Sequence, residues 1–395
     1  MATYHLMNKD QQLLTFTEPN ALGVYTIVCV DETQRHLFPP VFTSGIDERN
    51  LRTFIENRTV SVNRHHMEIV VGKLNLKTKF DMLRYCKGLA LTDTYWVRPD
   101  YETVTWADCN LYHNKFDQAL GWMAFTGVPS DVSKNLSTPE LTTVGVLPKY
   151  WDREASKVFL VKGGTLDYAN AGLEPISEVC ASVIAVALGL NAIDYTYRIM
   201  AVKGKQKPAS ICRLFTSEAI GLLTAQEFKQ VIGLEKSSLS LEDYMKAMEA
   251  HGLDIAPLKR MIFFDDLVRN PDRHLNNWGF SVDNVTGQLI GFAPIWDTGE
   301  ALIAKTMDMD FPLMMTSEEA FSSFGIMYKG LRPLFYHDQE KADCRRMIAM
   351  VDSGALVAEF KTRNIPVEDY PKLELIAQIV KTRATMILQD LGERV

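Results

Sequence analysis

The sequence predicts an α+β protein in which a smaller β-rich part is followed by a larger helical part. β-branched and aromatic runs closed by glycine, such as VFLVKGG, occur between residues 138 and 215. After residue 216, apolar residues recur mostly at helical spacing. We therefore expect domains at residues 128–215 and 216–395, preceded by a mixed α/β module at residues 1–127.

Composition and charge limit the function classes. The 395 residues exceed one typical domain, and a 47% hydrophobic fraction is ordinary for a globular protein. The net charge of −7 argues against direct nucleic-acid binding. No run approaches the roughly 18 apolar residues of a membrane span, and the N-terminus lacks signal-peptide regions. The six cysteines are scattered, which is typical of reduced thiols, so we expect a cytoplasmic protein without a membrane partner.

The N-terminal module is predicted from short β-type runs at Val24–Val30 and Met67–Val71. It contains no catalytic signature. A break is expected in GVPSDVSKNLSTPE, where Ser, Thr, Pro, Gly and Asn cluster between periodic segments.

Three strands and a helix are predicted in the β-rich part. VFLVKGG, Tyr195–Val202 and Ile211–Phe215 are the strands. EPISEVCASVIAVALGLN predicts a helix, because Pro175 suits its first turn and Gly189 its C-terminal stop.

The helical part begins with predicted helices at Leu222–Ile232, Leu241–His251 and Ala256–Val268. A β-hairpin is then predicted, because Trp278–Val282 and QLIGFAPIWD flank the turn residues DNVTG. A long helix is expected in PKLELIAQIVKTRATMILQDL near the end of the chain.

The strongest chemical signal is NPDRHLNNWGF, residues 270–280, between a predicted helix and the hairpin. Phosphoryl transfer needs a carboxylate near the acceptor hydroxyl and oxygen ligands for Mg²⁺. Asp272 and Asn277 can supply a base and a metal ligand, and Asp297 at the end of the hairpin a second metal ligand. Asp272 and Asn277 could also be ordinary turn formers, but their context favours the functional interpretation.

This stretch resembles the catalytic loop of HipA-like serine/threonine kinases and, more distantly, the DRHxxN loop of phosphatidylinositol kinases. The resemblance implies a bilobal protein-kinase-like fold, with residues 128–215 and 216–395 as its lobes, and ATP and Mg²⁺ as cofactors. It makes Asp272 the catalytic base and Asp297 the counterpart of the DFG aspartate. It makes Asn277 a metal ligand and adds His274 to the catalytic set as a loop-shaping residue. IWDTG replaces DFG, and the HRD and APE forms are absent.

TTVGVLPKYW, residues 142–151, looks like the family's phosphate-side loop. Backbone N–H groups around a glycine can cradle phosphates. The residues that the resemblance then assigns to the nucleotide are Thr142, Thr143, Gly145 and Lys149. The loop is not a G-x-G-x-x-G loop, and it has Leu147 where the family usually has Gln. In some family members its hydroxyl residue is autophosphorylated, and the matching residue is Thr142.

Lys162 closes the apolar strand VFLVKGG and needs either a solvent exit or an anionic partner. The resemblance makes it the ATP-binding lysine and Glu178 its partner. Glu178 could instead be an exposed first-turn residue that favours the helix dipole. The resemblance also makes Ile211–Phe215 the hinge, in which the backbone groups of Arg213 and Phe215 contact adenine.

The sequence therefore predicts an ATP- and Mg²⁺-dependent Ser/Thr protein kinase that acts on a protein substrate. Three alternatives stay open: a lipid or small-alcohol kinase with the same site, an ATP-binding pseudokinase or regulatory module, and an AMP transferase. The resemblance also admits a small antitoxin-like protein partner.

Overall fold

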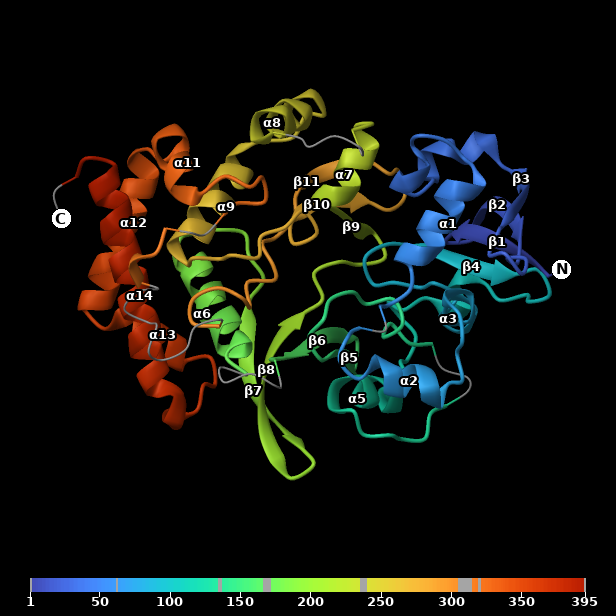
Figure 1. The fold of residues 1–395 in the computed structure, drawn as a ribbon, viewed down its shortest axis with the longest axis horizontal. Coiled ribbons are helices and arrows are strands. Elements are labelled where there is room, and N and C mark those ends of the chain that lie inside the picture. Colours follow the sequence, from blue (N-terminus) through green and yellow to red (C-terminus); the bar gives the residue numbers. More distant parts are fainter. Residues whose placement is uncertain are drawn as a thin grey trace. The chain divides into compact units, whose positions relative to one another are not determined.

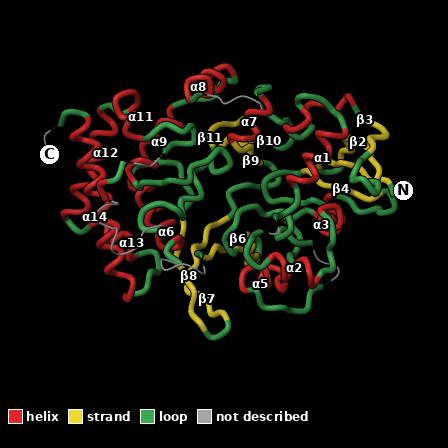
Figure 2. Tube along the Cα trace, viewed as in Figure 1, coloured by secondary structure: helices red, strands yellow, loops and turns green. Residues whose placement is uncertain are grey.

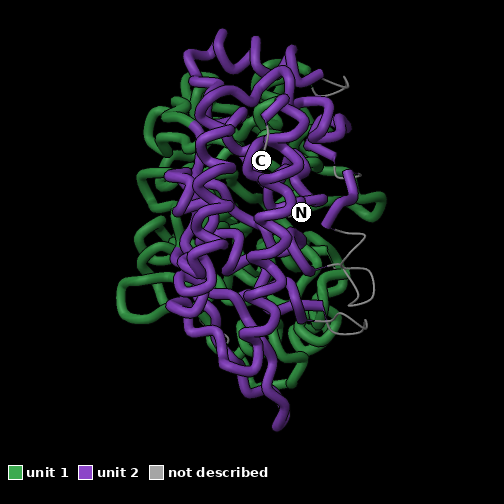
Figure 3. The backbone as a smooth tube through the Cα atoms, turned by 90° about the vertical axis from the view of Figure 1, so that its left-hand side faces the viewer, with its two compact units in different colours: residues 1–161, 214–237, 279–291 green, residues 162–213, 238–278, 292–395 purple. Residues whose placement is uncertain are grey.

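Figures 1 and 2 show a computed structural model that describes residues 2–61, 63–133, 137–165, 172–234, 240–304, 315–318 and 321–393. The chain forms two compact units, coloured separately in Figure 3. The first unit contains residues 1–161, 214–237 and 279–291, and the second contains residues 162–213, 238–278 and 292–395. Each unit is therefore assembled from three separate segments of the sequence.

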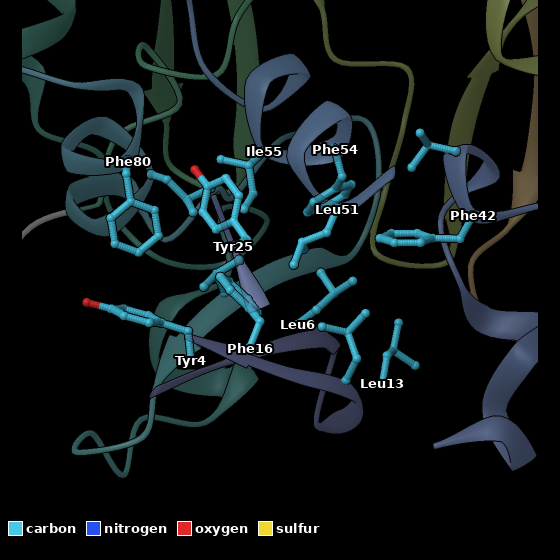
Figure 4. Packing of buried hydrophobic residues seen from close by; sticks show 14 residues of the cluster. Tyr4, Leu6, Leu13, Phe16, Tyr25, Phe42, Leu51, Phe54, Ile55 and Phe80 are labelled. Atoms are coloured by element: carbon cyan, nitrogen blue, oxygen red, sulfur yellow. The ribbon is translucent and has the colours of Figure 1, made fainter. Parts of the chain in front are cut away.

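The first unit opens with an antiparallel sheet of order β3-β2-β1-β4. Its strands are β1 (Thr3–Asn8), β2 (Gln11–Thr17), β3 (Thr26–Val30) and β4 (Tyr95–Pro99). Aromatic and aliphatic side chains of this sheet pack against helices α1 (Glu48–Asn57) and α3 (Lys79–Cys86), as Figure 4 shows. The rings of Tyr4 and Phe80, for example, meet edge to face at 5.0 Å. This core gives the N-terminal module an apolar centre of its own.

The remaining elements of the first unit are short. They are η1 (Glu32–Leu37), η2 (Pro40–Phe42), α2 (Met67–Lys73), α4 (Trp106–Cys109), α5 (Gln118–Thr126), β5 (Lys149–Glu154), β9 (Ile220–Thr224), α7 (Ala225–Val231), β10 (Gly279–Asp283) and β11 (Leu289–Phe292). The predicted hairpin is confirmed as β10 and β11, which form a sheet of order β11-β10-β9. Of the predicted interdomain break, residues 134–136 lie outside the described part of the chain.

Two predictions of local structure in this unit are wrong. Met67–Val71 is helix α2 and not a strand, because Met67 and Val70 are buried three residues apart while Glu68 between them is exposed. The predicted helix Leu222–Ile232 begins three residues too early, since Ile220–Thr224 pairs antiparallel with β10. Thr224 then caps helix α7 through a capping box with Glu227.

Strand β6 (Lys157–Gly163) begins in the first unit and ends in the second, and it belongs to a sheet of order β5-β6-β8-β7. In the second unit, β7 (Tyr195–Val202) and β8 (Lys205–Arg213) form an antiparallel hairpin. Figure 1 shows the hairpin as a long ribbon. Lys203 and Gly204 at its tip both have positive φ, which is the requirement of a tight hairpin turn. Helix α6 (Glu174–Ala187) packs against β7 and β8 and is buried along most of its length. Pro175 lies in its first turn, as predicted.

The rest of the second unit is helical. Its helices are α8 (Leu241–Ala250), α9 (Ala256–Leu267), α11 (Tyr328–Phe335), α12 (Asp338–Asp352), α13 (Ala355–Lys361), η4 (Val367–Asp369) and α14 (Tyr370–Asp390). Helix α9 is buried over its last turns and contacts α11 and α14. The helices predicted for α8, α9 and α14 are confirmed. Across the described part of the chain, every helix is too short or too polar to cross a membrane.

Candidate active site

A cluster of three charged side chains lies in the second unit: Lys162 and Glu178 are buried, and Asp297 is partly exposed. Lys162, at the end of β6, is only 5% exposed and donates from Nζ to Oε1 of Glu178 at 2.7 Å. The same ammonium bonds to Oδ1 of Asp297. Glu178 lies on the buried face of α6, and its second oxygen accepts from the Ser210 hydroxyl at 2.6 Å. The structure thus brings together three residues that are up to 135 positions apart in sequence.

The charge state of Lys162 follows from these contacts. Burial by itself lowers the pKa of the amine, but the carboxylates of Asp297 and Glu178 more than offset burial, so the pKa is raised. Lys162 is therefore an ammonium group at every physiological pH. A fixed positive charge is what a phosphate-binding lysine requires.

The backbone just before Asp297 is held through Ile295. The amide of Ile295 donates to the Asn191 carbonyl at 2.8 Å, and the Ile295 carbonyl accepts from Ile193 at 2.9 Å. Asp297 itself has a φ of +55°, a left-handed conformation that Asp tolerates better than most residues. Such strained geometry persists only where surrounding contacts enforce it.

The loop that follows α9 is organised by its own side chains. The Asn270 Oδ1 accepts from the Asp272 amide at 3.1 Å, and the Asn277 Nδ2 donates to the Asp272 carbonyl at 2.9 Å. This amide nitrogen is turned toward Asp272, so the amide oxygen of Asn277 is the atom a cation would take. The Asp272 side chain is 42% exposed, which leaves its carboxylate accessible to an acceptor molecule.

His274 is placed to shape this loop. Its Nδ1 accepts from the Asn276 amide at 3.2 Å, so in the neutral ring Nε2 carries the proton. Nε2 lies 4.0 Å from Oδ2 of Asp272, beyond hydrogen-bond distance. The His274 backbone also closes the turn, because its carbonyl accepts from the Asn277 amide at 2.9 Å.

Arg273 is a central residue of the site that the sequence interpretation missed. Its guanidinium forms a two-pronged ion pair with Asp265, at 2.9 and 3.0 Å. Its remaining nitrogen Nη1 donates to the carbonyls of Asn277 and Trp296, each at 2.6 Å. One nitrogen therefore joins the loop to the residue before Asp297. A signal was present in the sequence, because MIFFDDLV places two carboxylates in an otherwise apolar helical run.

The predicted phosphate-side loop lies in the first unit and is tied by its hydroxyl groups. Thr142 donates to the Leu89 carbonyl at 2.7 Å, and Thr143 donates to Pro139 at 2.8 Å. Gly145 has a φ of +100°, and a Cβ at this position would clash with the Nζ of Lys149. That Nζ donates to the Val144 carbonyl at 3.0 Å. The loop therefore requires glycine at this turn, and its contact with nucleotide stays a prediction.

The predicted hinge residues lie at the end of β8. Arg213 is the last residue of the strand and has an exposed side chain, and Phe215 follows in the loop. Between them, the Leu214 amide donates to the Val158 carbonyl at 2.8 Å. Strand β8 ends two residues earlier than predicted. The adenine-binding role of Arg213 and Phe215 stays a prediction.

The donor set suits a hard cation with few protein ligands. Among the described residues, no group of three or more His, Cys, Asp or Glu side chains could hold a metal ion. Asn277 and Asp297 offer an amide oxygen and a carboxylate, which are the ligand types that Mg²⁺ accepts together with phosphate oxygens and water. The residues therefore fit a shared metal–nucleotide site better than a metal site made of protein alone.

Comparisons with known proteins bear on the fold. No protein-family model and no curated protein matches this chain. HipA of Shewanella oneidensis MR-1, solved in a toxin–antitoxin complex with HipB and operator DNA, superposes with a TM-score of 0.56 at 12% identity, covering 99% of this chain and 100% of HipA. The chain has a HipA-like α+β fold.

A second solved structure is the proinflammatory kinase CtkA of Helicobacter pylori, with 18% identity and a TM-score of 0.46. It covers 61% of this chain and 90% of CtkA. The predicted mixed α+β fold class is confirmed by the likeness of the whole chain to HipA. A shared fold does not assign roles to individual residues, so those roles have to be argued from the geometry of the site.

Proposed function

We propose that this chain is an ATP- and Mg²⁺-dependent Ser/Thr protein kinase. The observation that carries the proposal is the pairing of the buried Lys162 with both Glu178 and Asp297. A lysine held by a helix glutamate, beside a metal-type aspartate, is the arrangement that phosphoryl transfer from a nucleotide uses. The HipA-like fold supports the same assignment at the level of architecture.

The side chains of the site then have separate tasks. Lys162 steadies the phosphates, and Asn277 and Asp297 hold Mg²⁺, which when bound neutralises phosphate charge. Asp272 orients the acceptor hydroxyl and takes its proton; its half-exposed carboxylate suits a protein acceptor that arrives from solution. His274 keeps the turn between Asp272 and Asn277 closed.

The test is the intact mass of the protein after incubation with ATP and Mg²⁺, for the wild type and for Asp272→Ala. A phosphate-sized gain that the variant loses supports the proposal, and peptide mapping then asks whether Thr142 is the acceptor. Asp131→Ala is the matched control, because the Asp131 carboxylate is fully exposed and pairs only with Lys73 at the surface.

Other outcomes separate the alternatives. An AMP-sized gain means adenylyl transfer. Transfer to lipid vesicles or small alcohols, and not to protein hydroxyls, means a lipid or small-alcohol kinase. ATP binding without transfer to any acceptor, with peptides bearing Ser or Thr included, would leave a nucleotide-binding module and contradict the proposal.

A small antitoxin-like protein is the partner that we propose for this chain. The support is that the HipA of similar fold was solved with HipB. Co-purification of the tagged chain with the product of a neighbouring small gene tests it. The absence of a stable complex with that product would remove the proposal and leave the kinase assignment unaffected.

A further inference from the structure

One buried carboxylate connects the parts of the candidate site. Asp265 lies on α9, is fully buried, and has no charged neighbour in sequence other than Asp266. Its Oδ1 accepts from Asn270 Nδ2 at 2.9 Å and from Arg273 Nη2 at 3.0 Å. Its Oδ2 accepts from Arg273 Nε at 2.9 Å. Both oxygens are therefore used, by two side chains of the same loop.

Each of these two side chains then holds backbone beside a catalytic group. The Oδ1 of Asn270 accepts a hydrogen bond from the Asp272 amide at 3.1 Å. Arg273 donates at 2.6 Å to the carbonyls of Asn277 and of Trp296, which precedes Asp297. Two hydrogen bonds thus connect the Asp265 carboxylate to the proposed base Asp272, to the proposed metal ligand Asn277 and to Trp296, the residue before Asp297.

The energetics favour a role beyond stability. Burying an ion pair costs desolvation, and well-packed apolar residues of similar volume commonly stabilise a core as well. What apolar residues cannot do is fix three backbone groups in defined positions. Metal ligands need this kind of outer support, since loss of an outer partner typically costs about 10- to 100-fold in metal affinity or activity.

Asp266, the next residue, provides a comparison within the same helix. It is equally buried, but its partners are Arg332 at 2.8 Å and Arg383 at 2.6 Å. Arg332 is also bonded to Glu318 at 2.9 Å. This second network joins α9 to α11 and α14 and includes no residue of the catalytic loop.

From these contacts we infer that Asp265 is the positioning residue of the site. Through Asn270 it sets the place of Asp272, and through Arg273 it sets the places of Asn277 and Asp297. The inference rests on the proposed kinase function for its catalytic readout, and it adds a residue that acts only through others. Loss of the connection through Asn270 and loss of the connection through Arg273 should therefore have different consequences.

The two connections differ in whether added Mg²⁺ should restore activity. Asp265→Asn and Arg273→Lys release both metal ligands, so kcat falls by about 10-fold or more, and raised Mg²⁺ partly restores it. Lys keeps the charge but lacks the planar fork, so it cannot replace Arg273. Asn270→Ala loosens only Asp272, so kcat falls without rescue by Mg²⁺. The double variant Asp265→Asn/Arg273→Lys is no worse than Asp265→Asn alone, because Arg273 acts together with Asp265.

The experiment measures kcat, KM for ATP and the Mg²⁺ dependence for these variants on the full-length chain. Asp266→Asn is the matched control: it loses stability, seen as a lower Tm, while kcat stays within about twofold. Should Asp266→Asn not fold, Asp343→Asn takes its place, because Asp343 is a buried carboxylate paired at 2.7 Å with Arg260, away from the loop.

A second readout does not need catalysis. Mn²⁺ binding in the presence of ADP is expected to weaken by about 10-fold in Asp265→Asn and Arg273→Lys and to be unchanged in the control. A wild-type chain that transfers no phosphoryl group would contradict the proposed function. Mn²⁺ binding would still test whether Asp265 positions the metal ligands. Equal effects of Asp265→Asn and the control on Mn²⁺ binding, or a kcat for Asp265→Asn within twofold of wild type, would overturn it.

Discussion

Lys162 is the residue on which the site's electrostatics depend. It is buried and pairs with the buried Glu178 and the partly exposed Asp297, and their attraction keeps its pKa above the ordinary value despite burial. Removing Lys162 leaves the buried Glu178 as an uncompensated charge in a dry environment. The same lysine therefore contributes both to stability and to the proposed binding of phosphates.

We expect Lys162→Met to lower the free energy of unfolding by about 3 kcal/mol, because the buried Glu178 loses its counter-charge. ATP binding should be lost as well. Urea unfolding and a nucleotide-binding titration measure the two effects. Lys73→Met is the control: its pair with Asp131 is at the surface, where such pairs contribute about 0–1 kcal/mol. Equal losses of stability in both variants would contradict this account of Lys162.

Asp272 supports a different prediction, because its side chain is partly exposed and it is the proposed general base. Asp272→Asn should lower kcat by about 10²- to 10⁴-fold, the usual contribution of a general base, with KM for ATP little changed. Steady-state kinetics at several ATP concentrations measure both constants. A variant that retains more than a tenth of the wild-type kcat would show that another group takes the proton.

At the scale of elements, helix α9 ends in two consecutive carboxylates that serve two networks. Asp265 faces Arg273 in the loop after α9, and Asp266 faces the arginines of α11 and α14. Adjacent residues of a helix point about 100° apart, so one helix can bind two different neighbours at once. The loop after α9 is consequently anchored at its first residues by a helix that is itself fixed in the helical core.

The phosphate-side loop gives a prediction at this scale. Gly145→Ala should raise KM for ATP, because a Cβ at φ +100° is strained and would displace the Lys149 ammonium. Gly23→Ala is the matched control, since Gly23 also has a positive φ, of +74°, but has no neighbour within 4 Å of the added Cβ. Kinetics and Tm are measured for both. An unchanged KM in Gly145→Ala would remove the loop from the nucleotide site.

At the scale of the whole molecule, the buried thiols make the protein sensitive to alkali. Burial raises the pKa of Cys86 to about 11 and that of Cys212 to about 12. All six cysteines are free, and Cys29 is exposed. The folded state thus binds thiol protons more tightly than the unfolded state, whose thiols titrate near pH 9.

The buried thiols change the stability of the protein only at alkaline pH. Below pH 9 these thiols are protonated in both states, and stability does not change with pH on their account. Above pH 9 the unfolded chain loses protons first, so stability falls as the pH rises toward the folded pKa. For Cys86 alone the fall is about 2–3 kcal/mol by pH 11. Unfolding by urea between pH 8 and pH 11 measures it. Cys86→Ala should flatten the slope of unfolding free energy against pH, and Cys29→Ala should not. Equal slopes in the wild type and both variants would contradict a role of the buried thiol.

The sequence predicted most elements that have a strong local pattern. The hairpin around DNVTG, the helix with Pro175 in its first turn and the long helix near the C-terminus lie where their periodicity indicates. The errors at Met67–Val71 and Leu222–Ile232 arose where a short apolar run fits both periods. In the second case the decision came from pairing with β10, which is distant in sequence and invisible to a local pattern.

By itself, the sequence determined the α+β class and the candidate chemistry, because both depend on residue types at short spacing: NPDRHLNNWGF for the loop, VFLVKGG for the strand. Only the tertiary structure decided which distant groups meet. Lys162 reaches Asp297 across 135 positions, and Arg273 joins the loop to Trp296 through carbonyl groups that every residue possesses. Contacts of this kind depend on chain packing and on backbone atoms, and neither leaves a mark in the order of the side chains.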